Sequence, residues 1–236
     1  MSRLAIVAAL EREVRPLLKH WQVRKREHAG REFRFYESRE AVVVCGGIGP
    51  EAARRAAEAV IVFYSPDFLY SVGYAGALDP TLKVADVLTP AHVINGSDGS
   101  RVDVSKGQGT LLSLNAVATI AQKSKLRESY GAQAIDMEAS AVARAAEARG
   151  VGFRAIKAIS DEFNFEVPMD GRFVDAEGRF HQARFTLHAL VRPWLWLPLL
   201  HLARKSARAT QALCAELGKI LTQETHAASS SEITQR

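Results

Sequence analysis

Cysteine is scarce in this chain, with only Cys45 and Cys214 among its 236 residues. Two distant cysteines in apolar surroundings form neither a disulfide framework nor a metal-ligand cluster, and they favour a reducing, cytoplasmic environment. The chain also lacks a run of 18 apolar residues without a charge, so we expect no transmembrane helix. The short apolar run at the amino terminus ends at Glu11, and this pattern does not predict a secretory signal peptide.

Several motifs that mark cofactor or metal enzymes are missing. The glycine-containing segments 46–49 and 73–76 match neither the dinucleotide fingerprint nor the P-loop, and the chain has no nucleophile-elbow motif. No pair among the seven histidines has the spacing of a metal site on a helix. We therefore expect neither a cofactor nor a metal.

The charge balance is mildly basic, with a formal net charge of +5. With 47% hydrophobic and 24% charged residues, the composition is that of a globular protein and excludes a fully disordered chain. The basic blocks 24–26, 123–127 and 204–208 are interpreted as solvent-exposed faces. Because aromatic residues are not interleaved with them, we do not expect a nucleic acid as partner.

Short apolar runs alternate with segments of helical periodicity along the chain. The runs predict strands at 3–10, 33–37, 41–45, 66–72, 84–94, 111–118 and 153–159, and the periodic segments predict helices at 11–21, 51–64, 137–149 and 181–221. This alternation predicts one α/β domain over residues 1–222, with a central mixed, mostly parallel sheet flanked by helices. Residues 95–109 read as a loop or hairpin, and the polar, serine-rich residues 223–236 as a disordered tail.

Polar or glycine-rich motifs follow four of the predicted strands, at 11–13, 46–49, 73–76 and 160–161. Ligands in α/β folds bind at the carboxyl ends of strands, so this coincidence predicts a single site. Each glycine segment on its own is equally well explained as a tight turn between a strand and a helix.

The carboxyl groups near these strand ends suit acid–base chemistry. A carboxyl group in a partly apolar pocket can hold its proton and act as an acid, while a second one in a wetter place orients water. Each also has a structural alternative: Glu11 and Glu13 as first-turn charges, Asp136 as a helix N-cap, and Asp161 as a cap of the next segment. Glu138, at the start of an alanine-rich helix, is harder to explain structurally.

Six segments occur in a fixed order: AALEREV at 8–14, GIG at 47–49, VGYAGAL at 72–78, DPTLKVAD at 79–86, DMEA at 136–139 and AISD at 158–161. In this order they resemble the purine nucleoside phosphorylase/nucleosidase superfamily, and within it the methylthioadenosine/S-adenosylhomocysteine nucleosidase branch. The resemblance covers about residues 4–221. The ordered combination is specific, although no single segment is.

The resemblance implies cleavage of the N-glycosidic bond of a purine nucleoside, with oxocarbenium character developing on the ribose. By position, Asp161 is implied as the acid at the purine N7, and Ser160 as the residue that helps to place it. Glu138 is implied to hold the ribose hydroxyls with Met137 packed on the sugar, and Glu13 to orient the attacking water. The remaining substrate-binding positions implied are Gly47, Gly73, Tyr74, Ala75 and Gly76.

The chain departs from this branch at the glycine segment. Tyr74 stands where the branch usually has serine, which narrows or reshapes the sugar end of the site. The phosphorylase branches usually carry an arginine just before this segment, and residues 69–72 offer none. Arg12 and Arg54 are candidate phosphate ligands, but we favour water as the nucleophile.

A second departure is the apolar segment HALVRPWLWLPLLH at 188–201, which stands where the branch has a plain helix. It is interpreted either as an oligomer interface or core-packing helix, or as an element that places Trp194 and Trp196 at the headgroup depth of a membrane. The membrane interpretation resembles the hopanoid-associated phosphorylase group, which acts on adenosylhopane.

We therefore expect a homo-oligomeric cytoplasmic enzyme that releases adenine from a 5′-substituted adenosine such as methylthioadenosine or S-adenosylhomocysteine. One alternative is hydrolytic or phosphorolytic removal of adenine from adenosylhopane, with peripheral contact at the inner membrane surface. A non-catalytic nucleoside-binding protein is the alternative from another class.

Overall fold

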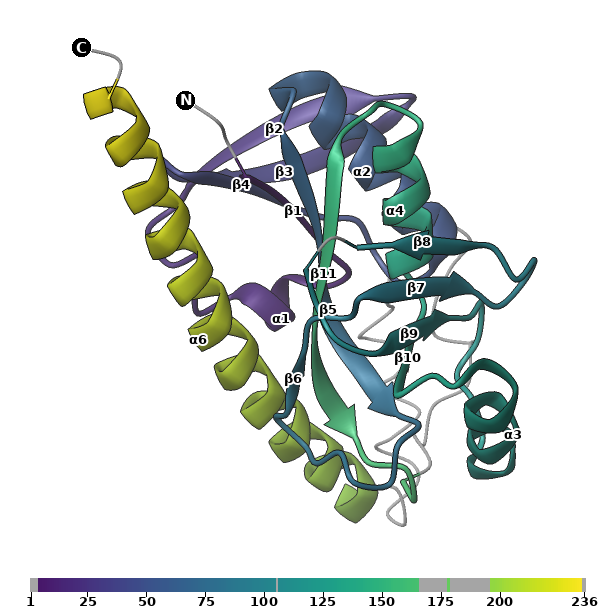
Figure 1. Cartoon of the computed structure of the whole chain (residues 1–236). Helices are drawn as coiled ribbons and strands as arrows, with labels where there is room; N and C mark the ends of the chain where they lie inside the picture. The colour runs from purple at the N-terminus through teal and green to yellow at the C-terminus, as the bar shows by residue number, and fades with distance from the viewer. Residues whose placement is uncertain (1–3, 105, 166–177, 179–195, 235–236) are drawn as a thin grey trace.

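The computed structural model describes residues 4–104, 106–165, 178 and 196–234 of the chain. Its strands form one mixed sheet, and helices lie on both faces of the central strands (Figure 1). The strands are β1 Leu4–Ala8, β2 Gln22–His28, β3 Arg31–Glu37, β4 Ala41–Cys45, β5 Phe68–Ala77, β6 Val87–Leu88, β7 His92–Asn95, β8 Arg101–Asp103, β9 Thr110–Ser113, β10 Ala134–Asp136 and β11 Gly152–Asp161. The helices are α1 Glu11–Val14, α2 Pro50–Tyr64, α3 Ile120–Tyr130, α4 Ala139–Glu147 and α6 Trp196–Thr234.

The centre of the sheet is parallel. Strand β1 pairs in parallel with β4 on one side and β5 on the other, and β5 also pairs in parallel with β11. The carboxyl ends of these strands therefore meet at one edge of the sheet, where all four sequence motifs of interest lie. Antiparallel pairs flank this centre, among them β2 with β3 and β3 with β4. The predicted α/β fold with a mixed sheet is confirmed.

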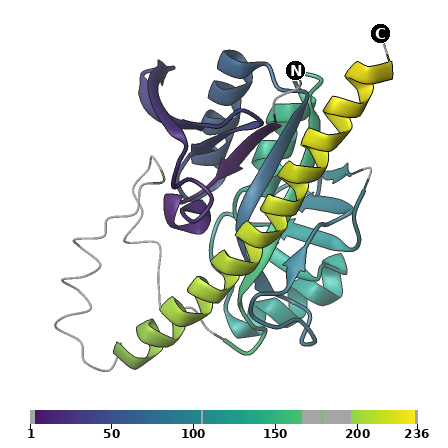
Figure 2. The same ribbon diagram turned by 90° about the vertical axis from the view of Figure 1, so that its left-hand side faces the viewer.

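Strand β1 is apolar throughout because both of its faces are buried. Ala5 and Val7 pack toward α2 and α4, whose alanine-rich faces allow a close approach. Leu4 and Ile6 point to the opposite face, where they share a cluster with Leu213 of α6. This alternation follows from the two-residue period of a strand. Figure 2 shows α6 crossing the face of the sheet obliquely.

The segments after the central strands differ from prediction in two places. The helix expected over 11–21 ends at Val14, and the chain continues in turns because Pro16 has no backbone N–H for a longer helix. The strand expected over 66–72 runs on to Ala77, so the glycine segment 73–76 is extended strand rather than a turn. The hairpin alternative for 95–109 is confirmed in part by the antiparallel pair of β7 and β8.

Three elements were not predicted. Strand β10 has only three residues, which is too short for a recognisable pattern. Strand β2 is largely exposed and carries charged residues, so it has no apolar signal. Helix α3 is polar nearly all round, and its start is fixed by the Thr119 side chain, which accepts a hydrogen bond from the Gln122 backbone.

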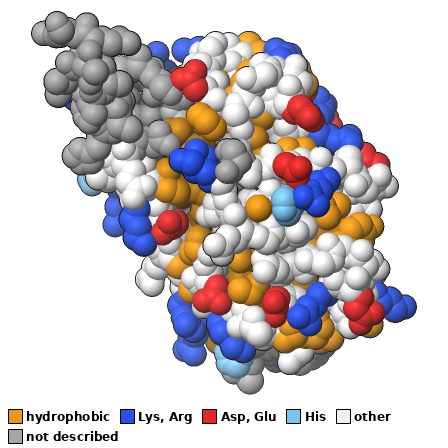
Figure 3. Space-filling view, viewed as in Figure 1, with side chains coloured by type: hydrophobic (Ala, Val, Ile, Leu, Met, Phe, Trp, Pro, Cys, Tyr) orange, Lys and Arg blue, Asp and Glu red, His pale blue; other side chains and the backbone are white. Residues whose placement is uncertain are grey.

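The carboxyl-terminal region contains further differences. Residues 223–234, for which we expected disorder, continue α6 as far as Thr234, since helix propagation adds one hydrogen bond per residue. Trp196 begins α6, whereas Trp194 and the rest of 188–195 lie outside the described residues. No helix in the described part of the chain is long and apolar enough to cross a membrane. On the face shown in Figure 3, the described acidic and basic side chains are interspersed.

Candidate active site

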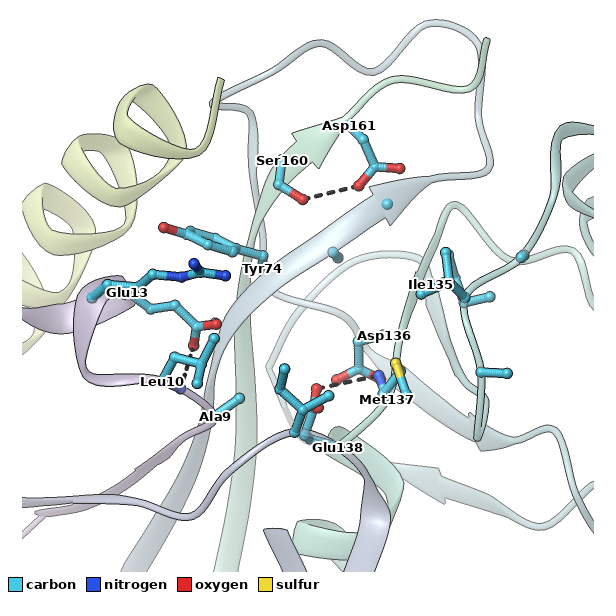
Figure 4. Close-up of a pocket in the computed structure, with 18 of the residues that line it drawn as sticks. Ala9, Leu10, Glu13, Tyr74, Ile135, Asp136, Met137, Glu138, Ser160 and Asp161 are labelled. Atoms are coloured by element: carbon cyan, nitrogen blue, oxygen red, sulfur yellow. Dashed lines mark hydrogen bonds between the residues drawn. The ribbon is translucent and has the colours of Figure 1, made fainter. Parts of the chain in front are cut away.

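A cavity of about 190 Å³ opens at the carboxyl edge of the sheet. Its walls come from the segment after β1, from β5, from the junction of β10 and α4, from the end of β11 and from α3 (Figure 4). Nine of the ten predicted site residues line it: Glu13, Gly73, Tyr74, Ala75, Gly76, Met137, Glu138, Ser160 and Asp161. Two carboxyl groups that the sequence separates widely, Glu138 and Asp161, therefore face one space.

Asp161 forms one wall of the cavity and is buried. Its Oδ1 accepts a hydrogen bond of 2.9 Å from Ser160 Oγ, and its Oδ2 accepts one of 2.8 Å from Lys123 Nζ. A β-carbon at Gly76 would lie 2.8 Å from Asp161 Oδ2, so only glycine leaves room for this carboxylate. The oxygen atoms of Asp161 are thus held from two sides.

Glu13 lies on the opposite side of the cavity from Asp161 (Figure 4). Burial and the nearby Glu138 raise the pKa of Glu13 to about 7, while the Lys157 ammonium acts in the opposite direction. A β-carbon at Gly73 would lie 2.9 Å from Glu13 Oε2, so this glycine also makes room for a carboxylate. A carboxyl group with a pKa near 7 exchanges protons readily at neutral pH.

Glu138, at the start of α4, is held by two backbone N–H donors, one from the start of α2 and one from the residue before Glu138. Its Oε1 accepts a hydrogen bond of 2.8 Å from the backbone N–H of Gly49, and its Oε2 accepts one of 3.3 Å from Met137 N–H. Burial and the neighbouring Asp136 carboxylate raise the pKa of Glu138, against the effect of Lys157 and these backbone donors. The Gly49 bond connects the glycine segment 46–49 to the sugar-binding position that the resemblance implies.

A buried ion pair neighbours these carboxylates, and one of its members, Asp136, also lines the cavity. Lys157 Nζ is 2.8 Å from Asp136 Oδ2, and both side chains are almost fully buried. Burial opposes the charged ammonium, but Asp136, Glu138 and Glu13 outweigh it and raise the pKa of Lys157. Asp136 also accepts hydrogen bonds from Ala139 N–H and Ser113 Oγ. The N-cap of α4 is Glu138 and not Asp136 as expected, although Asp136 binds the backbone N–H of the first helical residue.

Tyr74 reaches from the glycine segment to α6. Its hydroxyl shares a hydrogen bond of 2.5 Å with Thr210 Oγ1 and donates one of 3.2 Å to the Ser206 carbonyl. Burial raises the pKa of Tyr74, so the phenol stays neutral. The ring lines the cavity while the hydroxyl is bound elsewhere, and the departure from serine therefore adds a wall that is anchored to α6.

One predicted site residue, Gly47, lies outside the cavity lining. At the glycine segment, Ile48 lines the cavity and Gly47 does not; the Gly47 N–H donates instead to the Ala9 carbonyl, and its φ of 106° suits glycine. Glu11, one of the carboxylates considered, accepts a hydrogen bond from Tyr36 and also lies outside.

Sequence reasoning missed two buried lysines of the site. Lys157 interrupts the apolar strand AIKAIS, and a lone lysine in a strand buried on both faces is a signal that it has a buried acidic partner. Lys123 lies in a segment that reads as a solvated basic block, so the sequence contains no comparable signal. Among the described residues, no group of three or more His, Cys, Asp or Glu side chains is placed to hold a metal ion.

The arrangement suits the cleavage of a bond whose leaving group takes the electron pair on one side of the cavity while positive charge develops on the other side. Asp161 can interact with a leaving group, while Glu138 and Glu13 can stabilise positive charge and take a proton from water. The neutral lining residues Ala75, Ile48 and Met137 complete the space between them.

Comparison with known proteins places this geometry in context. The profile of the phosphorylase superfamily matches residues 3–117 and 108–193, which together span most of the chain. A 5′-methylthioadenosine/S-adenosylhomocysteine nucleosidase of Staphylococcus aureus is 26% identical over 204 residues, covering 70% of this chain and 89% of that protein.

Solved structures share the fold. The 5′-methylthioadenosine/S-adenosylhomocysteine nucleosidase of Campylobacter jejuni is similar with a TM-score of 0.68 at 17% identity, covering 94% of this chain and 98% of that one. The corresponding enzyme of Colwellia psychrerythraea, solved in complex with adenine, has a TM-score of 0.60 at 22% identity, covering 68% and 83%.

Proposed function

Because the chain belongs to the phosphorylase superfamily, we propose that it cleaves the N-glycosidic bond of a purine nucleoside and releases adenine. The proposed substrates are 5′-substituted adenosines such as methylthioadenosine and S-adenosylhomocysteine, on which the similar Staphylococcus aureus enzyme is named to act. The observation that carries the proposal is that Asp161 and the pair of Glu13 and Glu138 line opposite parts of one cavity.

In the proposed reaction the base leaves toward Asp161. The electron pair of the C1′–N9 bond goes to the purine, and the protonated carboxyl group of Asp161 gives its proton to N7, so that neutral adenine leaves and Asp161 becomes a carboxylate. The ribose gains positive charge, which the Glu138 carboxylate stabilises while it binds the hydroxyls. Glu13 takes a proton from water, whose oxygen bonds to C1′.

Water rather than phosphate is the proposed nucleophile. Two carboxylates, Glu13 and Glu138, line this part of the cavity and would repel a phosphate dianion. Of the two candidate phosphate ligands, Arg54 is paired with Glu51 and Glu58 on the surface of α2 and does not line the cavity, whereas Arg12 does.

A lipid-linked nucleoside such as adenosylhopane is the second candidate substrate. One observation favours it: near the start of α6, the exposed residues Leu200, Arg204 and Arg208 follow one another at helical spacing, which suits an anionic membrane surface. In this variant of the proposal, Trp194 and Trp196 contact the membrane, and the enzyme works at the cytoplasmic face of the inner membrane. We also propose that the chain is a homo-oligomer in the cytoplasm.

A substrate panel tests the function. Adenine release is measured from methylthioadenosine, S-adenosylhomocysteine and a lipid-linked adenosine presented in vesicles, with and without phosphate. We expect release from the small nucleosides without phosphate. We expect loss of release in Asp161→Asn, which still folds but melts at a lower temperature, because Lys123 loses its buried carboxylate partner. Strict dependence on phosphate would contradict hydrolysis, and nucleoside-induced stabilisation without product would indicate a non-catalytic binding protein. Sedimentation analysis tests the oligomer.

A further inference from the structure

Helix α3 contributes one buried side chain to the cavity. Lys123 is 2% exposed, although its neighbours Gln122 and Ser124 on the same helix are exposed. Its Nζ lies 2.8 Å from Asp161 Oδ2, 3.2 Å from the Glu162 carbonyl and 3.2 Å from the Phe165 carbonyl. An ammonium has three N–H donors, and these three acceptors use all of them.

Transferring a lysine ammonium from water to the protein interior costs free energy unless the ammonium is paired with an acceptor. The burial of Lys123 at this wall therefore indicates that its pairing has a function. The partner is the carboxylate that the proposed reaction places at the leaving base. Ser160 holds one oxygen of Asp161 and Lys123 holds the other, so the rotation of the carboxyl group is fixed from both sides.

We propose that Lys123 is a positioning residue for Asp161, which holds the carboxyl group where it meets the leaving purine. The inference rests on the proposed function and extends it to a residue outside the segments that carry the family resemblance. Because its three donors are used, Lys123 acts on the base through Asp161. The Glu162 and Phe165 carbonyls fix the ammonium in turn, so α3 and the segment after β11 jointly set the place of the acid.

A purely structural role is the competing explanation, since Lys123 also anchors segment 162–165. The chain offers a matched control in Lys205 of α6. Lys205 Nζ lies 4.0 Å from Glu162 Oε2 and 4.2 Å from the centre of the Phe165 ring, so it contacts the same segment from another element. Replacing it disturbs the anchoring of the segment, whereas replacing Lys123 also releases the Asp161 carboxylate.

The test compares Lys123→Met with Lys205→Met in adenine release from the best substrate of the panel. For Lys123→Met we expect kcat to fall about 100-fold with KM changed by less than about threefold, since misplacement of a reacting group by about 1 Å has an effect of this size. For Lys205→Met we expect both constants within about threefold of wild type. Equal effects of the two substitutions, or a loss confined to KM, would overturn the proposal.

A double variant asks whether Lys123 acts through Asp161. If it does, adding Lys123→Met to Asp161→Asn lowers kcat little further, whereas independent roles would multiply the two losses.

If the melting temperature shows that Lys123→Met does not fold, the variants Lys123→Arg and Lys123→Gln are used in its place. The arginine variant is expected to keep more kcat than the glutamine variant, and the reverse order would contradict positioning by a cation. A wild-type chain that releases no base contradicts the proposed function, while active wild type with unaffected Lys123 variants contradicts this inference alone.

Discussion

The Lys157 ammonium lies 2.8 Å from the carboxylate of Asp136, a residue that lines the cavity, and three carboxylates surround this ammonium in all. The other two carboxylates belong to Glu13 and Glu138, which line the same cavity. One buried cation therefore balances the charge of two residues that the proposed reaction uses and of a third, Asp136, that accepts a hydrogen bond from the first backbone N–H of α4. This arrangement ties stability and activity to the same side chain.

Replacing Lys157 with methionine is expected to destabilise the fold by about 3–5 kcal/mol, because Asp136 is left as a buried carboxylate without its cation. Urea unfolding of the variant measures the loss. Lys25 is the matched control: its ion pair with Glu32 is more than half exposed on both sides, so Lys25→Met should cost less than about 1 kcal/mol. A Lys157→Met protein as stable as the control would disprove the role of the ion pair.

The activity should rise with pH through about 7. Glu13 must be ionised to take a proton from water, and its pKa is raised to about 7 by burial and by Glu138. A profile of kcat/KM for adenine release between about pH 4 and 9 shows the position of this limb. A limb near the ordinary glutamate value of 4.5 would remove Glu13 from the role of base.

The free energy of unfolding should also depend on the ionisation of Glu13, but it should fall with rising pH where the activity rises. The folded state holds the Glu13 proton more tightly than the unfolded state, so the stabilising contribution is complete below about pH 4.5 and is lost as pH rises through about 7. Glu13→Gln removes this titration. Unfolding free energies measured over that interval should fall less steeply in the variant than in wild type, and parallel curves would show that Glu13 does not titrate there.

The central strands and the place of the site could be predicted because their signals are local. The runs LAIVA and AVVVC are apolar since both faces of the parallel centre are buried, and polar residues begin where these strands end. Parallel pairing then brings Glu13 and Asp161 to the same edge of the sheet.

The glycine segment and the lysines could not be predicted in this way. The glycines of segment 73–76 resemble a turn in the sequence, but the segment is part of β5. Glycine is needed at positions 73 and 76 because the carboxylates of Glu13 and Asp161 fill the space that side chains would take. Lys123 is buried because Asp161 and the carbonyls of Glu162 and Phe165, all at least 38 residues away in the sequence, lie beside α3 and accept its hydrogen bonds. Such reasons depend on contacts far apart in the sequence, which local patterns do not contain.

Tyr74→Phe is expected to lower stability by about 1 kcal/mol, because the hydroxyl loses its bonds to Thr210 and Ser206. The ring still lines the cavity, so kcat should stay close to wild type. Thermal unfolding of Tyr74→Phe, Thr210→Val and the double variant measures the coupling: the double loss should be smaller than the sum of the single losses. Additive losses would indicate that the two hydroxyls do not act together.

Gly76→Ala tests whether the Asp161 carboxyl group needs the space that is left by the missing side chain of Gly76. Its added β-carbon would lie 2.8 Å from Asp161 Oδ2, a distance that forces the carboxylate to move. We expect kcat for adenine release to fall by about 100-fold, since the displaced group no longer meets the leaving base.

Gly218→Ala is the control for this substitution, because a β-carbon at that position of α6 meets no atom within 4 Å. Alanine there should stabilise the helix by about 0.5–1 kcal/mol and leave kcat unchanged. If Gly76→Ala kept the kcat of wild type while folding normally, the Asp161 carboxylate could occupy another position without loss. Its assignment as the group that meets the leaving base would then be wrong, because the geometry around Gly76 allows the present position only in the absence of a side chain.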